Sequence, residues 1–200
     1  MATVHETTRQ LFRRHGGTLR TQEALNAGVH PRTLYELRDR GELEQLARGV
    51  YRLVDMPPLS DPDLVTVSKR VPQGVICLIS ALAFHELTTQ IPHAIHLALE
   101  QGAWTPQLEY PPIQIYHFSK SAFTAGIEPH DMDGIQVRVY SPEKTLADCF
   151  KFRNRIGLDV ALEALRAYRS RRNARLGQVL EYARVCRVEK IMRPYLEAIA

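Results

Sequence analysis

Two residues near position 32 have side chains suited to reading the bases of duplex DNA. Arg32 and Thr33 directly follow the dipeptide His30-Pro31. Arginine can donate two hydrogen bonds to guanine in the major groove, and threonine can contact a base or the methyl group of thymine. Helix-turn-helix modules place the first residues of their second helix in that groove. We therefore predict base contacts from Arg32 and Thr33.

A second set of residues suits the phosphate backbone. Phosphate contacts fix the register of a protein on DNA without carrying sequence information. The expected phosphate-binding residues are Arg20, Thr21, Gln22, Arg38 and Arg48. Tyr35 lies on the predicted solvent-facing side of the same helix and completes the predicted DNA-binding set. A protein-binding role for this region stays open, because Glu36 is spaced to pair with Arg32 or Arg40 along a helix.

Turn signals around these residues predict the elements that position them. Pro31 suits the first position of a helix, where its missing N–H costs nothing, and Gly41 suits the end of that helix. At helical spacing, Leu34 and Leu37 share the face that would turn toward a core. Thr21 is expected to be the N-cap of a shorter helix that precedes the turn.

Two short apolar stretches then predict a hairpin, which would be the wing. They run from Leu43 to Leu46 and from Val50 to Leu53, and Ala47-Arg48-Gly49 between them supplies a basic tip. Upstream, apolar residues at helical spacing before Gly16-Gly17 predict one more helix. Residues 1–54 are thus expected to form a winged helix-turn-helix domain.

The composition is that of a soluble globular chain with basic ends around an acidic middle. Hydrophobic residues make up 44% of the 200 residues, which is enough for one large domain or two small ones. The net charge is +3 over residues 1–52, −5 over residues 53–140 and +6 over residues 141–200. Because neither a membrane-spanning apolar run nor a secretory leader is visible, we expect a cytoplasmic protein without a membrane partner. The cysteines are expected to be reduced and mostly buried: Cys77, Cys149 and Cys186.

A proline-rich segment separates the first domain from the rest of the chain. Residues 55–62 contain three prolines, which interrupt helices and central strands and therefore predict a linker. Residues 63–200 are expected to form a mixed α/β domain, with strands at about 95–140 and helices at about 141–199. The predicted fold class is α+β, an N-terminal winged helix-turn-helix followed by this mixed domain with a helical C-terminal bundle.

Arginines cluster near a predicted junction between two C-terminal helices. The cluster comprises Arg166, Arg169, Arg171, Arg172 and Arg175. Such a run can be an ordinary solvated face. It can also be a surface for a protein partner or for the DNA backbone, and it is the candidate partner-binding site of the chain.

Groups at catalytic or metal-binding spacing are few. His93 and His96 lie near a predicted strand, where an odd separation places side chains on opposite faces, so they are poor joint metal ligands. Ser80 and His85 share a helix without forming a nucleophile and base pair. The segment Asp131–Gly134 predicts a turn rather than a cation site. No acidic residue is followed two positions later by lysine, and no glycine-rich phosphate loop is present. We expect no catalytic residue, no metal and no cofactor.

Three segments in this order resemble the AbiEi family of antitoxins. The first consists of Gly28-Val29, Leu34, Leu37, Gly41, Leu43 and Arg48-Gly49-Val50-Tyr51-Arg52. The second runs from Ile79 to Pro92, and the third runs from Tyr140 to Phe150 with the sequence Tyr-Ser-Pro-Glu-Lys-Thr-Leu-Ala-Asp-Cys-Phe. The resemblance covers nearly the whole chain.

The resemblance implies a non-enzymatic, DNA-binding antitoxin that represses its own toxin–antitoxin operon through the winged helix. The implied functional partner is a toxin of nucleotidyltransferase type, and family antitoxins of this kind, called type IV, act without direct contact with the toxin. Binding of double-stranded DNA at the chain's own promoter would use inverted half-sites. Family members without a recognisable toxin imply an alternative, a stand-alone transcriptional regulator with a sensing or partner-binding C-terminal domain. A third possibility, a nucleic-acid enzyme delivered by the N-terminal module, is disfavoured because no carboxylate cluster is visible.

Overall fold

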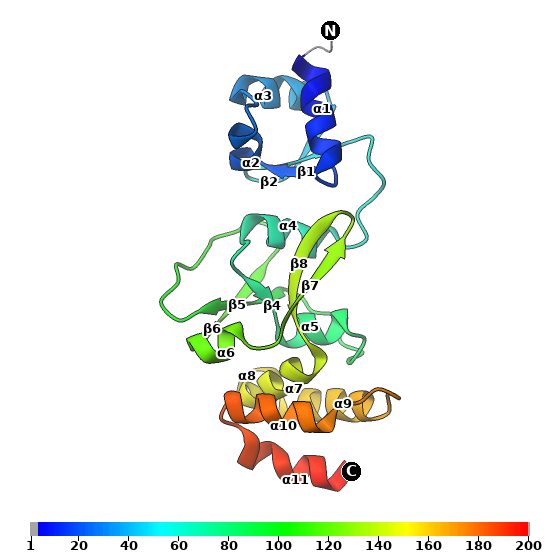
Figure 1. Cartoon of the computed structure of the whole chain (residues 1–200), viewed down its shortest axis with the longest axis vertical. Helices are drawn as coiled ribbons and strands as arrows, with labels where there is room; N and C mark the ends of the chain where they lie inside the picture. Colours follow the sequence, from blue (N-terminus) through cyan, green and yellow to red (C-terminus); the bar gives the residue numbers. More distant parts are fainter. Residues whose placement is uncertain (1–3, 200) are drawn as a thin grey trace. The chain divides into compact units, whose positions relative to one another are not determined.

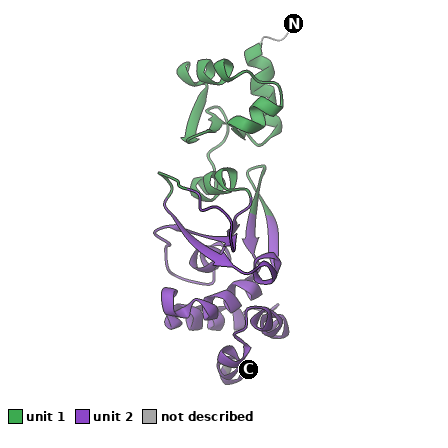
Figure 2. Cartoon of the chain, turned by 90° about the vertical axis from the view of Figure 1, so that its left-hand side faces the viewer, with its two compact units in different colours: residues 1–72, 107–111, 130–137 green, residues 73–106, 112–129, 138–200 purple. Residues whose placement is uncertain are grey.

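The computed structural model describes residues 4–199, and the chain divides into two compact units (Figure 2). The first unit runs to Pro72 and also includes residues 107–111 and 130–137, while the remaining residues form the second. This division differs from the expected boundary at residues 55–62. The first unit passes through that segment and ends beyond it.

The first unit contains the expected helices and hairpin (Figure 1). Its leading elements are α1 (Val4–Arg14), β1 (Thr18–Arg20), α2 (Thr21–Asn26), α3 (Pro31–Asp39), β2 (Leu43–Ala47) and β3 (Val50–Leu53). Strand β3 lies between β1 and β2 and runs antiparallel to both. This is a winged helix-turn-helix, although β1 was not predicted from the sequence.

One face of the small sheet packs against the three helices. Phe12, Leu34 and Leu37 are at most 1% exposed, and they share a core cluster with Leu19 and Tyr51, which are paired across β1 and β3. Burial of an apolar side chain of this size contributes about 1.5–3 kcal/mol. The predicted apolar face of the helix at residues 31–39 is therefore the face that fixes it to the sheet.

The other face of this sheet is closed by the residues that follow it in the chain. Arg52 lies between the core residues Tyr51 and Leu53 on β3, so strand alternation directs it to the other face, yet it is only 3% exposed. Its guanidinium donates to Oγ1 of Thr18 at 2.9 Å, to the Gly16 carbonyl at 3.2 Å and to the Pro57 carbonyl at 2.5 Å. Helix α4 (Pro62–Arg70) contacts all three strands. These contacts explain why the proline-rich segment and α4 belong to the first unit.

The second sheet is mixed, with the strand order β6-β5-β4-β8-β7. Its elements are β4 (Val75–Ile76), α5 (Leu78–Phe84), β5 (Ile95–Glu100), β6 (Ile113–Phe118), α6 (Lys120–Thr124), β7 (Ile127–Met132) and β8 (Ile135–Tyr140). Strand β5 is parallel to β6 and antiparallel to β4, and β4 is parallel to β8. The predicted α+β class is confirmed, but α6 and β7 were not expected.

The turn between β7 and β8 belongs to the first unit. Asp133 and Gly134 have φ angles of +56° and +80°, and the Gly134 amide donates to the Asp131 side chain at 3.1 Å. The Ser60 amide donates to the Asp133 carboxylate at 2.8 Å. The predicted turn is therefore present, and one of its carboxylates holds the proline-rich segment.

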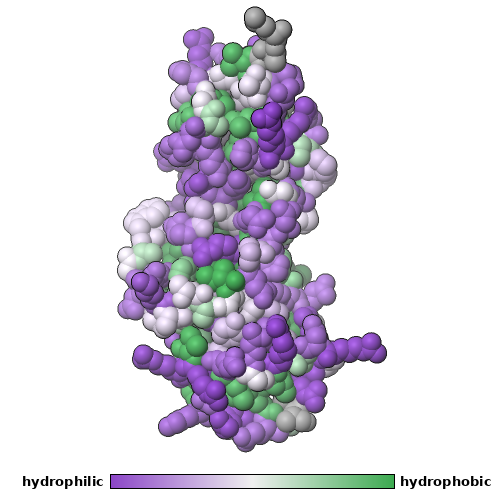
Figure 3. Space-filling view, viewed as in Figure 1, coloured by the Kyte–Doolittle hydropathy of each residue, from purple (hydrophilic) through white to green (hydrophobic). Residues whose placement is uncertain are grey.

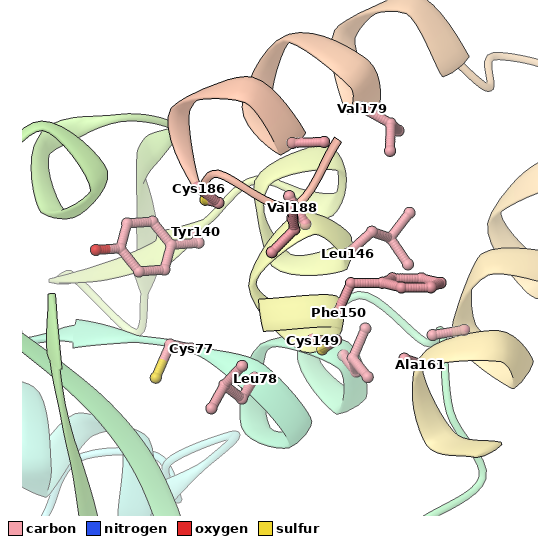
Figure 4. Packing of buried hydrophobic residues seen from close by; sticks show 14 of the residues in the cluster. Cys77, Leu78, Tyr140, Leu146, Cys149, Phe150, Ala161, Val179, Cys186 and Val188 are labelled. Atoms are coloured by element: carbon pink, nitrogen blue, oxygen red, sulfur yellow. The ribbon is translucent and has the colours of Figure 1, made fainter. Parts of the chain in front are cut away.

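The C-terminal helices surround a central helix, α7 (Pro142–Lys151), whose residues 143–150 are all buried. The others are α8 (Arg153–Ile156), α9 (Leu158–Arg169), α10 (Leu176–Val185) and α11 (Glu189–Ile199). Leu146 and Phe150 project from α7 into a core that also receives Ala161 and Val179 from neighbouring helices (Figure 4). None of the helices within residues 4–199 has both the length and the apolar character needed to cross a membrane.

The cysteines are free and buried, in agreement with the sequence analysis. Figure 4 shows Cys149 on α7, whereas Cys77 directly precedes α5 and Cys186 directly follows α10. Burial raises the pKa of each thiol, to about 12 for Cys186. Because the thiolate is the reactive form, these residues act as small core side chains.

Candidate nucleic-acid interface

Helix α3 begins and ends at the residues that its sequence predicts. Pro31 occupies the first turn, and Nδ1 of His30 accepts a hydrogen bond from the Arg32 amide at 3.2 Å. Gly41 follows the helix with a φ of +71°, a conformation that glycine adopts without steric cost. With Leu34 buried below, the opposite side of α3 is left for solvent or a ligand.

Arg32 dominates the exposed side of α3. Its side chain is 81% exposed, and its Nε donates to the Glu36 carboxylate at 2.9 Å, one helical turn further on. Hydrogen bonds from His5 and Arg32 lower the pKa of Glu36, so this carboxylate stays charged. An exposed ion pair of this kind is weak. Arg32 can therefore exchange this contact for another acceptor, such as the edge of a nucleic-acid base.

Tyr35 and Arg38 extend the same exposed surface. The guanidinium carbon of Arg38 lies 5.2 Å from the centre of the Tyr35 ring, which is the geometry of a cation–π contact. Arg38 also donates to Asp39 at 2.8 and 2.9 Å, and this hydrogen bonding raises the pKa of Arg38. Hydrophilic residues predominate on the face of the N-terminal unit shown in Figure 3.

Thr33 does not share this surface. It is only 7% exposed and is among the buried residues of α3. It lies between the exposed and the apolar side of the helix, where the packing of three helices on one sheet leaves little open surface. We therefore leave Thr33 out of the base-contacting set.

The residues at the start of α2 are partly engaged within the protein. The Thr21 amide donates to the Gly49 carbonyl at 2.9 Å, and Nε of Arg20 lies 3.3 Å from Glu23. Arg20, not Thr21, is the N-cap residue of α2. Its amide donates to the Glu23 carboxylate at 2.8 Å. This bond satisfies the N-cap amide and not the first amides of the helix, which the Thr21 hydroxyl was expected to cap. Gln22 is exposed and bonds to Asn26.

Arg48 stands at the tip of the β2–β3 hairpin. It is exposed, and the following Gly49 has a φ of +75°. The bond between Gly49 and Thr21 ties this tip to the start of α2. The predicted site residues of the first unit therefore lie on three adjoining elements, with Thr33 turned inward.

The C-terminal arginine cluster separates into structural and exposed members. Nη2 of Arg171 donates to the His85 carbonyl, and a guanidinium nitrogen of Arg175 lies 2.8 Å from Glu143, which is 2% exposed. Arg171 and Arg175 thus tie elements of the second unit together. The exposed members without such a contact are Arg166, Arg169 and Arg172, while the Arg175 side chain is 61% exposed despite its ion pair.

The structure also identifies contributors that the sequence analysis missed. Arg52 ends the Arg48–Arg52 motif and holds the sheet from behind, as described above, and Lys69 of α4 pairs with Glu23 at 3.2 Å. Strand alternation places Arg52 on the face of the sheet opposite to the three helices. Its burial could be predicted only if that face were also known to be covered. That coverage comes from α4, which the sequence alone assigned to the other domain.

The histidines and the serine singled out in the second unit do not form a metal-binding cluster. No group of three or more His, Cys, Asp or Glu side chains within residues 4–199 could hold a metal ion. His93 precedes β5, so strand alternation does not relate its side chain to that of His96, and both residues line one hollow with Gln90 and Gln114. The Ser80 hydroxyl accepts from the His96 amide at 2.9 Å and has a structural role.

The N-terminal helices and hairpin match a known protein family. Residues 6–54 match the family described as transcriptional regulator, AbiEi antitoxin. We refer to residues 6–54 as the AbiEi region. The match spans α1 to β3, so the exposed Arg32, Tyr35, Arg38 and Arg48 all lie inside the AbiEi region, while α4 lies outside it.

Other comparisons bear on the remainder of the chain. No curated protein sequence matches this chain significantly. Among solved structures, the crystal structure of the RV2827C protein from Mycobacterium tuberculosis is similar, with a TM-score of 0.53 and 16% sequence identity. The alignment covers 96% of this chain and 79% of that one. At this identity the similarity shows a shared fold that extends beyond the AbiEi region.

Proposed function

We propose that the chain is a transcriptional regulator that binds duplex DNA through α3, the start of α2 and the tip of the β2–β3 hairpin. The observation that carries this proposal is the exposed side of α3. Arg32, Tyr35 and Arg38 stand on it, and buried leucines hold the helix from below. The AbiEi match over the same residues supports the assignment.

The proposed residues have different roles on DNA. Arg32 is assigned to a base edge in the major groove, because it lies in the first turn of α3 and is the most exposed side chain of its surface. Phosphate contacts are assigned to Arg38 and Arg48, with Arg20, Thr21 and Gln22 supporting them from α2. Two copies of the chain would read inverted half-sites in its own promoter.

An electrophoretic mobility-shift assay on a duplex from the chain's own promoter tests these roles. We expect Arg32→Ala to lower the preference for this duplex over a scrambled one. We expect Arg48→Ala to weaken binding to both duplexes alike. Lys190→Ala removes an exposed charge from α11 and serves as the control. The assignment fails if the wild-type chain does not shift the duplex at low salt, or if Arg32→Ala and Arg48→Ala bind like the control.

We further propose that the chain is the antitoxin of a toxin–antitoxin pair, with a nucleotidyltransferase-type toxin as its functional partner and autorepression of their operon. The exposed arginines at positions 166, 169 and 172 are the candidate surface for a partner in this role. Co-expression with a neighbouring nucleotidyltransferase should restore growth that the toxin alone arrests. If growth is not restored while promoter binding is intact, the chain is a stand-alone regulator.

A further inference from the structure

Some cations of the first unit form an ion pair with a carboxylate, and others do not. Ion pairs with Asp or Glu engage Arg9, Arg13, Arg20, Arg32, Arg38 and Lys69. Arg40 bonds to His5, and Arg52 bonds to hydroxyl and carbonyl oxygens. Across residues 4–72, the cations without a partner in the structure are Arg14, Arg48 and Arg70.

Two of these unpaired cations belong to residues at or beside the hairpin tip. Arg48 is exposed and precedes the turn residue Gly49, while Arg70 is the half-buried last residue of α4. A β-carbon placed on Gly49 would lie 3.8 Å from Nη1 of Arg70 and 3.5 Å from Oγ1 of Thr21. The Arg70 guanidinium therefore borders a turn that has no side chain of its own.

This arrangement is suited to an anion with several oxygen atoms. Guanidinium groups bind phosphate with paired hydrogen bonds, and a glycine allows another backbone to approach closely. In the proposed interface, the ligand group that would reach a hairpin tip bonded to the start of α2 is the phosphate backbone of DNA. We propose that Arg70 and Arg48 together bind a backbone phosphate of the DNA at this tip, an inference that rests on the proposed DNA binding. Arg70 thereby extends the interface beyond the AbiEi match, which ends at residue 54.

Affinity measured over a series of salt concentrations tests this assignment. The full chain is titrated with its own promoter duplex and with a scrambled duplex of equal length. Each phosphate contact contributes about 0.9 to the slope of log affinity against log salt. We expect Arg70→Ala to reduce the steepness of this slope by about that amount and to weaken binding roughly tenfold at low salt, equally on both duplexes. Arg70→Lys should retain most of the slope, because it keeps the charge.

Lys190→Ala is the matched control, because it removes one exposed, unpaired cation from α11 and lowers the net charge equally. Its slope should equal that of the wild type. Thermal unfolding of each variant reports whether it is folded, and Arg70→Gln replaces Arg70→Ala if the latter is not. A wild-type slope in the folded Arg70 variant overturns the inference. Absence of wild-type binding overturns the proposed function instead, and Arg32→Ala should change sequence preference with little change in slope.

Discussion

Burial determines the charge of His96, a residue of the second unit. Its side chain is 6% exposed, its ring centre lies 5.2 Å from that of Tyr116, and its Nδ1 has no hydrogen-bond partner among residues 4–199. Burial, with a smaller contribution from the charge of Arg155, lowers the pKa of His96 to about 4. The imidazole is therefore neutral at pH 7, and protonation is costly in the folded state.

Acidification should destabilise the protein through this residue. Between the unfolded pKa of about 6.5 and the folded pKa of about 4, the unfolded chain binds the proton and the folded chain does not. The free energy of unfolding should thus fall by ~3 kcal/mol as the pH drops through this window. Urea denaturation at pH 7 and at pH 4.5 measures the change.

The variant His96→Gln isolates this contribution. Other groups also respond to acid: burial raises the pKa of Glu143, but bonds from Tyr168 and Arg175 outweigh it, so the net shift is downward. The stability that Glu143 contributes is lost as the pH falls through its folded pKa. His96→Gln keeps this carboxylate and should show a smaller loss than the wild type. Equal losses in the two proteins would contradict the assignment to His96.

At the level of elements, α7 explains the motif that runs from Tyr140 to Phe150. Ser141 caps the helix by accepting from the Lys144 amide at 3.2 Å. One turn on, Nζ of Lys144 lies 2.5 and 2.7 Å from the carboxylate oxygens of Asp148, and both side chains are fully buried. The Lys144 ammonium also lies 4.1 Å from the centre of the Tyr140 ring. The motif therefore encodes a helix with a charged pair inside the core.

Removing one member of this pair should be far more costly than removing both. Lys144→Met leaves the Asp148 carboxylate buried without a counter-charge and should lower the free energy of unfolding by about 3–5 kcal/mol. The double variant Lys144→Met with Asp148→Leu should recover most of this loss, because no isolated charge remains. Denaturant titration of the three proteins completes the cycle. Additive losses in the double variant would show that the two side chains do not act as a pair.

Elements with strong local signals were predictable, and those defined by distant contacts were not. Pro31 and Gly41 bound α3 in the structure as they do in the sequence. Strand β1 has three residues, too few for a visible alternation, and β7 contains Pro129, which argues against a strand. The inward position of Thr33 depends on how closely the helices pack. Helix α4 was recognised as a helix, but its place in the first unit depends on contacts with β1, β2 and β3.

At the level of the whole molecule, the net charges counted along the sequence describe the charge of the folded units only in part. The AbiEi region carries the expected basic excess, yet most of its cations are neutralised by nearby carboxylates, so the net charge of +3 conceals where free charge lies. The position of unpaired arginines at the hairpin tip is visible only after folding. Long-range attraction of DNA depends on the net charge, whereas the strength of contact depends on these individual sites.

Methylation protection of the promoter duplex tests the central claim most directly, because dimethyl sulfate reacts with N7 of guanine in the major groove. The wild-type chain should protect guanines in each half-site. Arg32→Ala should lose protection at one guanine per half-site and retain it at the others. Identical protection patterns for the two proteins, or no protected guanine with the wild type, would contradict a base contact from Arg32 and the use of α3 as the recognition helix.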